Sequence, residues 1–128
     1  MRRSLFLGTL LLMVAFTAMA QDPVKVDPKH YKVELENSQV RVLRIHYGPH
    51  EKSVMHEHPA SVAVFLSAGD SKFTMADGKT TESHIKAGQT IWEDAGKHLP
   101  ENVGDQPFEL ILVELKARRA PAKATTTK

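Results

Sequence analysis

The sequence predicts an all-β protein with a single barrel or sandwich domain. Short segments alternate apolar and polar residues with a period of two, turn-forming glycines separate them, and no window shows a sustained helical stripe with caps. The chain has 128 residues, of which 41% are hydrophobic and 25% charged, a balance typical of a globular protein. We therefore expect one core and no internal domain boundary.

The first twenty residues have the pattern of a signal peptide. Two arginines precede an apolar run over residues 5–16, and the small-x-small pattern at 18–20 is one that signal peptidase cleaves. The run is shorter than the ~20 residues that a membrane span needs, and a membrane anchor is the alternative interpretation. We expect residues 1–20 to be removed, which leaves a periplasmic or secreted protein that begins at Gln21.

Residues 21–32 are expected to form an N-terminal lead-in, and residues 33–115 the β-domain. Within the domain, Asp77-Gly78 is typical of a tight hairpin turn, and Ala87-Gly88 marks a second break. Segments with β-branched residues or period-two character predict strands over 33–35, 40–45, 62–66, 73–75, 80–85, 90–92 and 108–115.

The distribution of charge excludes one class of partner. Residues 21–115 carry ten basic and fifteen acidic residues, so the body gives no electrostatic footprint for nucleic acid. Basic residues collect in the tail 116–128, which we expect to be disordered. The chain has no cysteine, so any bound metal must have nitrogen and oxygen ligands.

Three histidines are the candidate metal ligands. If His56 and His58 lie in a strand, their side chains project to the same face, because side chains alternate along a strand. Buried imidazoles need partners, and a divalent cation binds one nitrogen of each ring at about 2.0–2.1 Å. His98 is the candidate for a third ligand. A lone His-x-His is equally compatible with surface histidines or hydrogen-bonded core histidines.

These histidines lie in two motifs that resemble those of the cupin superfamily. The first motif of that superfamily runs from a glycine through His-x-His to a second glycine, and the second motif from a glycine to a histidine with an asparagine four residues beyond. The resemblance covers residues 33–115 and implies a single jelly-roll β-barrel of the cupin type with a metal at its centre. The matching residues are Gly48, His56, His58 and Gly69, and then Gly88, Gly96, His98 and Asn102.

The chain departs from the cupin pattern in three places. Val62 or Ala63 occupies the position of the usual glutamate ligand, Asp94 replaces a proline, and the step from Gly96 to His98 is one residue shorter. Three imidazoles without a carboxylate leave coordination positions open, as a catalytic metal site requires. The resemblance to three-histidine cupin dioxygenases favours Fe(II), with Zn, Mn, Ni or Cu as alternatives; a vacant site in a non-catalytic barrel also remains open.

Further residues near the motifs are candidates for roles in the pocket. Glu93 is the candidate general base or distant fourth ligand, and Glu101 a group that orients His98. Trp92 and Asn102 are candidates for lining a substrate pocket. Each has a plainer alternative in core packing or solvent exposure. His50 is expected near the barrel mouth, and surface or packing positions are expected for His30, His46 and His84.

Three classes of function remain open from the sequence. The first is a metal-dependent enzyme acting on a small molecule, with an oxygenase as one form; the second is a non-catalytic module that binds a small molecule or a metal. The third is a metal-assisted isomerase, for which Glu93 would supply the acid–base group. The expected partner is a small molecule, with no nucleic acid and no membrane span after signal removal, and the resemblance implies that a homodimer is possible.

Overall fold

The computed structural model describes residues 21–117; the expected signal peptide and most of the basic tail lie outside this range. No helix among the described residues has the length and apolar character needed to cross a membrane. The elements, in order, are α1 (Pro23–Val26), β1 (Tyr31–Glu36), β2 (Val40–Tyr47), β3 (His56–His58), β4 (Ser61–Phe65), β5 (Gly69–Met75), β6 (Thr80–Ile85), β7 (Thr90–Glu93), β8 (Gly96–Asn102) and β9 (Phe108–Leu115).

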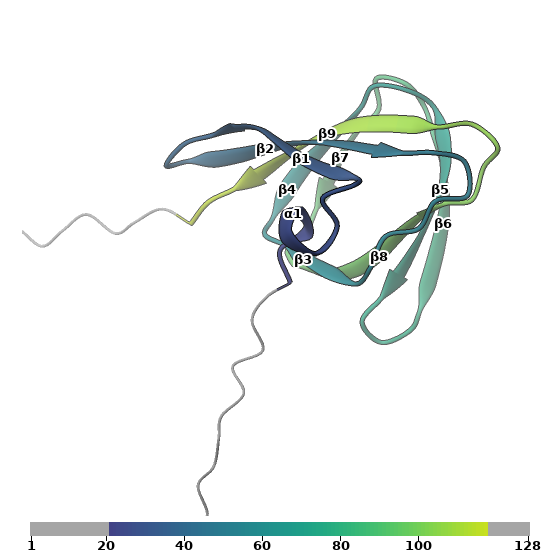
Figure 1. The fold of residues 1–128 in the computed structure, drawn as a ribbon, viewed down its shortest axis with the longest axis horizontal. Helices are drawn as coiled ribbons and strands as arrows, with labels where there is room; N and C mark the ends of the chain where they lie inside the picture. Colours follow the sequence, from purple (N-terminus) through teal and green to yellow (C-terminus); the bar gives the residue numbers. More distant parts are fainter. Residues whose placement is uncertain (1–20, 118–128) are drawn as a thin grey trace, which may run out of the picture.

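The strands form two antiparallel sheets that face each other across a shared interior (Figure 1). One sheet has five strands in the order β1-β2-β9-β4-β7, and the other has four in the order β3-β8-β5-β6. Neighbours in both sheets are often distant in sequence, so the chain crosses repeatedly from one sheet to the other. The all-β, jelly-roll fold class expected from the sequence is confirmed.

The core comes mainly from the five-stranded sheet. Along β9, Phe108, Leu110 and Leu112 point inward and are buried, while the residues between them are half-buried. On β2, Leu43 and Ile45 pair with Leu112 and Leu110 and face the same interior. Alternation of this kind buries one face of an antiparallel sheet, and it positions β9 so that its next inward residue reaches the histidines.

Local sequence explains some elements better than others. Gly78 takes a φ of +84° in the hairpin between β5 and β6, a conformation that glycine adopts without steric cost. The first strand begins at Tyr31, so the expected lead-in 21–32 contains a short helix and the start of β1. Strand β8 has a low β-propensity sequence that includes Pro100, and pairing with β3 and β5 supports it.

Candidate metal centre

Strands β3 and β8 bring the three histidines together. His56 and His98 are direct cross-strand partners, and His58 lies two residues along β3 on the same face. Their ring centroids are 4.8 to 5.2 Å apart, and one nitrogen from each ring lies within 4.8 Å of the others. Imidazoles from two distant stretches of sequence therefore converge inside the fold.

A buried carboxylate determines which nitrogen of His58 is available. Glu114 Oε1 accepts a hydrogen bond from His58 Nδ1 at 2.6 Å, and Arg41 Nε donates to Glu114 Oε2 at 2.5 Å. Because Nδ1 carries the donated proton, the Nε2 lone pair of His58 points into the site. A carboxylate behind a ligating histidine is a frequent feature of metal centres, where it orients the ring and raises its basicity.

A backbone carbonyl fixes the tautomer of His56 in the same way. Its Nδ1 donates to the carbonyl of Val54 at 2.8 Å, which leaves Nε2 as the unprotonated nitrogen. The Nε2 atoms of His56 and His58 lie only 3.0 Å apart. His98 Nε2 is buried and has no hydrogen-bond partner among the described residues. Two facing lone pairs and an unpartnered buried nitrogen fit a cation placed among the three rings.

Burial disfavours charge on these rings. Desolvation, together with the neighbouring His58, lowers the pKa of His56 to about 4. Desolvation, with His58 and His56 close by, lowers the pKa of His98 to about 3. Burial alone raises the pKa of Glu114, but hydrogen bonds from His58 and Arg41 outweigh burial and hold this pKa below its usual value. His56 and His98 are therefore held as neutral imidazoles, which is the state that ligates metals.

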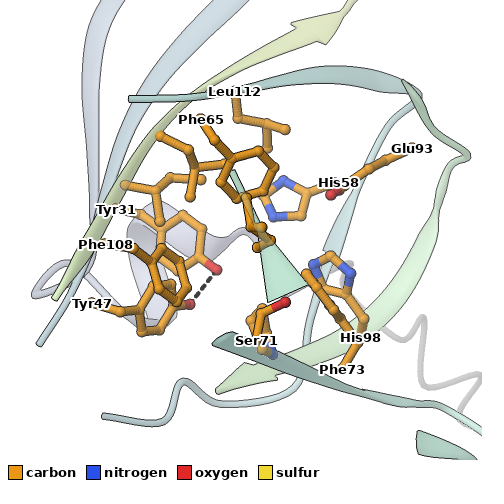
Figure 2. Close-up of a pocket in the computed structure, with 14 residues that line it drawn as sticks. Tyr31, Tyr47, His58, Phe65, Ser71, Phe73, Glu93, His98, Phe108 and Leu112 are labelled. Atoms are coloured by element: carbon orange, nitrogen blue, oxygen red, sulfur yellow. Dashed lines mark hydrogen bonds between the residues drawn. The ribbon is translucent and has the colours of Figure 1, made fainter. Parts of the chain in front are cut away.

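A small cavity, with about 30 Å³ open to the centres of water-sized molecules, lies beside the histidines. Its walls are mostly aromatic and aliphatic, and they include the hydrogen-bonded tyrosines Tyr31 and Tyr47, whose hydroxyl oxygens lie 2.6 Å apart (Figure 2). The ring of Tyr31 also packs against His58, with ring centroids 5.8 Å apart. Glu93 lines the same cavity, and burial raises the pKa of its carboxyl group. Glu93 therefore faces the interior, as a general base or distant ligand would need to.

Two sequence predictions about the pocket are wrong. Trp92 is 56% exposed, because the alternation of β7 turns Ile91 and Glu93 inward and Trp92 outward. Asn102 is fully buried but is absent from the cavity lining. Its Nδ2 donates to the carbonyls of Gly48 and Gln106 at 2.9 and 2.8 Å, so this side chain links the two loops that contain these residues.

The other candidates have structural partners. Glu101 forms an ion pair with Lys72 at 3.0 Å instead of bonding to His98. His50 is largely exposed and contacts Asp105. His46 and His84 are exposed. His30, however, is buried, with only 6% of its surface exposed.

Glu114 and the tyrosine pair were not among the site residues predicted from the sequence. Glu114 occupies the inward position that follows Phe108, Leu110 and Leu112 in the period-two pattern of β9. A carboxylate at a predicted core position needs a buried partner, so this exception to the apolar pattern was the signal that could have identified Glu114. Tyr31 and Tyr47 are separated by fifteen residues, and no local pattern indicated that their hydroxyls meet.

Comparisons with known proteins identify the fold. No protein-family model matches the chain, and no curated protein matches it. Among solved structures, a cupin domain from Bordetella pertussis is 24% identical, with a TM-score of 0.63 over 68% of this chain and 92% of its own. A double-stranded β-helix protein from Klebsiella pneumoniae is 24% identical, with a TM-score of 0.53 over 69% of this chain and 84% of its own.

A cupin 2 conserved barrel domain protein from Salinispora arenicola is 17% identical, with a TM-score of 0.53 over 68% of this chain and 75% of its own. At these identities the likeness concerns the fold. The chain therefore has a cupin-type fold with a three-histidine cluster in its interior.

Proposed function

We propose that the chain binds a divalent metal ion through His56, His58 and His98 and acts with it on a small molecule in the adjoining cavity. The observation that carries this proposal is the convergence of one nitrogen from each ring, with the His98 Nε2 buried and lacking a partner. A bound ion would supply a Lewis acid with open positions for a substrate donor atom.

The donor set and the resemblance to three-histidine cupin dioxygenases favour Fe(II), with Zn, Mn, Ni or Cu as alternatives. His56, His58 and His98 would hold the ion through one nitrogen each. Three histidine ligands without a carboxylate would leave positions open for a substrate donor atom, and bound Fe(II) would supply oxygen chemistry there.

The cavity lining supports a substrate with a mainly apolar body. Phe65, Phe73 and Phe108 contribute rings to the wall, and none of the lining residues is a lysine or an arginine. The space open to the centres of water-sized molecules is about 30 Å³, room for about two waters, so a larger ligand enters only if the side chains of the wall move. Sugars and phosphorylated molecules would also lose hydrogen bonds with water that this wall does not replace. A small molecule with one oxygen donor and an otherwise apolar body therefore suits the site best.

A pair of probes tests the apolar wall separately from metal ligation. Benzoate and acetate share the same donor group, and only benzoate has a body that contacts the aromatic wall. We expect benzoate to bind the Fe(II)-loaded or Co(II)-loaded protein about tenfold more tightly, since tenfold corresponds to ~1.4 kcal/mol of apolar burial. Phe73→Ala should reduce this preference and leave acetate binding unchanged. Equal affinities for both probes in the wild-type protein would contradict the proposed substrate class.

If the metal-loaded protein is catalytic, the activity we propose is that of an oxygenase. Purified protein loaded anaerobically with Fe(II) should consume dioxygen when a small phenol, thiol or diketone is added, and the Zn-loaded protein should not. Probe binding without turnover in every metal form would favour a non-catalytic binding module instead. Stabilisation that grows with the logarithm of probe concentration is the signature of such a module.

The position of Glu93 favours isomerase chemistry as a second candidate. Its carboxyl lines the cavity beside His58 and His98, and burial raises its pKa, so it can hold a proton near a bound substrate. Glu93→Gln should then abolish turnover while the metal content stays the same. Loss of metal in this variant would indicate a ligand role instead.

We also propose that the protein is exported after cleavage behind Ala20. The basic start, the short apolar run and the small residues at 18–20 support this location. Protein recovered from the periplasm or medium should have Gln21 at its N-terminus. Cytoplasmic protein that retains the first twenty residues would contradict export.

A further inference from the structure

We propose that residues 21–30, here called the N-terminal strap, hold the histidines of β3 in their metal-binding orientation. The strap contains α1 and lies against β3, as Figure 1 shows. This inference deepens the proposed metal site and rests on it. It assigns a positioning role to Asp22 and Asp27, which match no motif.

The first contact of the strap leads to His58. Arg41 donates to both carboxylate oxygens of Asp22, from Nη1 at 2.9 Å and from Nη2 at 3.2 Å. The Nε of the same guanidinium donates to Glu114, which in turn accepts from His58 Nδ1. Asp22 therefore fixes the plane of Arg41, and Arg41 fixes the carboxylate that determines the His58 tautomer.

The second contact leads to His56. Ser53 Oγ donates to Asp27 Oδ2 at 2.5 Å and lies 3.4 Å from His56 Nδ1. Asp27 is only 8% exposed, and its carboxylate also faces His30 Nδ1 at 2.7 Å. A buried carboxylate with two partners is held rigidly, so it restrains Ser53 and the loop that leads into β3.

The third contact is with the strand itself. β3 has three residues and lies at the edge of the four-stranded sheet, where one side lacks a neighbouring strand. Glu57, between the two ligands, donates its backbone N–H to the carbonyl of Gln21 at 3.0 Å. The strap thus covers the free edge of a strand that is too short to be rigid alone. Pro23, in the helix of the strap, is fully buried, which anchors the strap to the rest of the fold.

Metal affinity measured in the purified protein tests the strap. Co(II) serves as the probe because its visible absorption reports ligand geometry. Asp22→Asn should weaken Co(II) binding about tenfold and change the absorption band, since outer partners of ligating histidines contribute about 10- to 100-fold. Asp22→Glu keeps the charge and should restore most of the affinity. Glu34→Gln breaks the exposed Glu34–Arg44 pair, a matched carboxylate–arginine contact, and should leave Co(II) binding unchanged.

A double-variant comparison separates positioning from general stabilisation. If Asp22 acts through Arg41 and Glu114, Asp22→Asn should weaken binding little further in a Glu114→Gln protein. Asp27→Asn acts on the other ligand, so its effect should multiply with that of Asp22→Asn. Full multiplication of the Asp22 and Glu114 effects, or equal losses for Asp22→Asn and Glu34→Gln, would overturn the proposed role.

Ring-nitrogen NMR keeps this inference separate from the proposed function. If the wild-type protein does not bind Co(II), the metal site itself is contradicted. The metal-free protein then still tests the strap, because it should hold the His58 proton on Nδ1, and Asp22→Asn should produce a mixture of tautomers. An unchanged His58 tautomer in this variant would overturn the inference. The same spectra also show whether the variant is folded.

Discussion

Two groups of buried histidines differ in what their ring nitrogens contact. His30 is satisfied on both sides, with Nδ1 2.7 Å from Asp27 and Nε2 3.0 Å from Glu51, and its ring stacks on Tyr47. The metal-centre histidines leave nitrogens facing one another or without a partner. His30, His56 and His58 are all buried and His98 is half-buried, so burial does not separate the two groups and the partners of each ring decide its role. A satisfied ring stabilises the fold, and an unsatisfied one is available for a ligand.

The largest expected effect separates the two groups by the sign of a stability change. His30→Ala removes a buried hydrogen-bond partner of the Asp27 carboxylate, and leaving a buried acceptor partly unsatisfied costs about 1–3 kcal/mol. His98→Leu removes an unpartnered polar nitrogen from an apolar site in the metal-free protein. We expect this change to be near neutral or stabilising, because no hydrogen bond is lost. Denaturant unfolding of metal-free protein measures both, and equal losses would contradict the distinction.

Metal addition should distinguish a metal-ligating histidine from an exposed one. At a free metal concentration of 100 times the dissociation constant, wild-type protein should gain about 2.7 kcal/mol in its free energy of unfolding. His56→Ala should lose this gain. His46→Ala, at an exposed position outside the site, should keep it and serves as the control. A gain that survives in His56→Ala would place the metal elsewhere.

The smallest expected effect is a pH dependence of the metal-free protein. The pKa values of His56 and His98 fall to about 4 and about 3 from an unfolded value of 6.5. The unfolded chain therefore binds more protons between pH 6.5 and 4.5, so stability is fully present above pH 6.5 and decreases as the pH falls. Over the first unit, from pH 6.5 to 5.5, the loss should amount to about 2 kcal/mol, about 1 kcal/mol from each ring.

A comparison with His98→Leu isolates this contribution from other titrating groups. Glu93 opposes the trend, because burial raises its pKa and the folded state then binds protons more strongly. The wild-type curve should be steeper than that of the variant between pH 6.5 and 4.5. Parallel curves would show that His98 is not held neutral by burial.

Sequence was a good guide where one pattern repeats over a segment. The long apolar segment Phe108–Leu115 predicted a strand, and the resemblance of two motifs to those of cupins predicted the cluster of His56, His58 and His98. The prediction failed for Trp92, because the pairing of its strand decides which way the side chain points. The indole of Trp92 faces outward and donates to Asp94 at 2.9 Å, and this follows only from the register of β7 against β4.

The outer partners of the histidines could not be derived from local sequence. Asp22, Arg41 and Glu114 are far apart in the chain, and each is an ordinary charged residue in its own segment. Their contact depends on the pairing of β2 with β9, which sets Arg41 directly opposite Glu114. Strand β8 was also missed, because Gly96, Lys97 and Pro100 have low β-propensity and long-range pairing overrides it.

Elemental analysis of natively purified protein tests the central claim most directly. Wild-type protein and His46→Ala should each carry about one transition-metal ion per chain, as three converging histidines require. His98→Ala, prepared in parallel, should carry little or none. Absence of transition metal from wild-type protein after aerobic and anaerobic purification, or an equal content in His98→Ala, would contradict the metal centre.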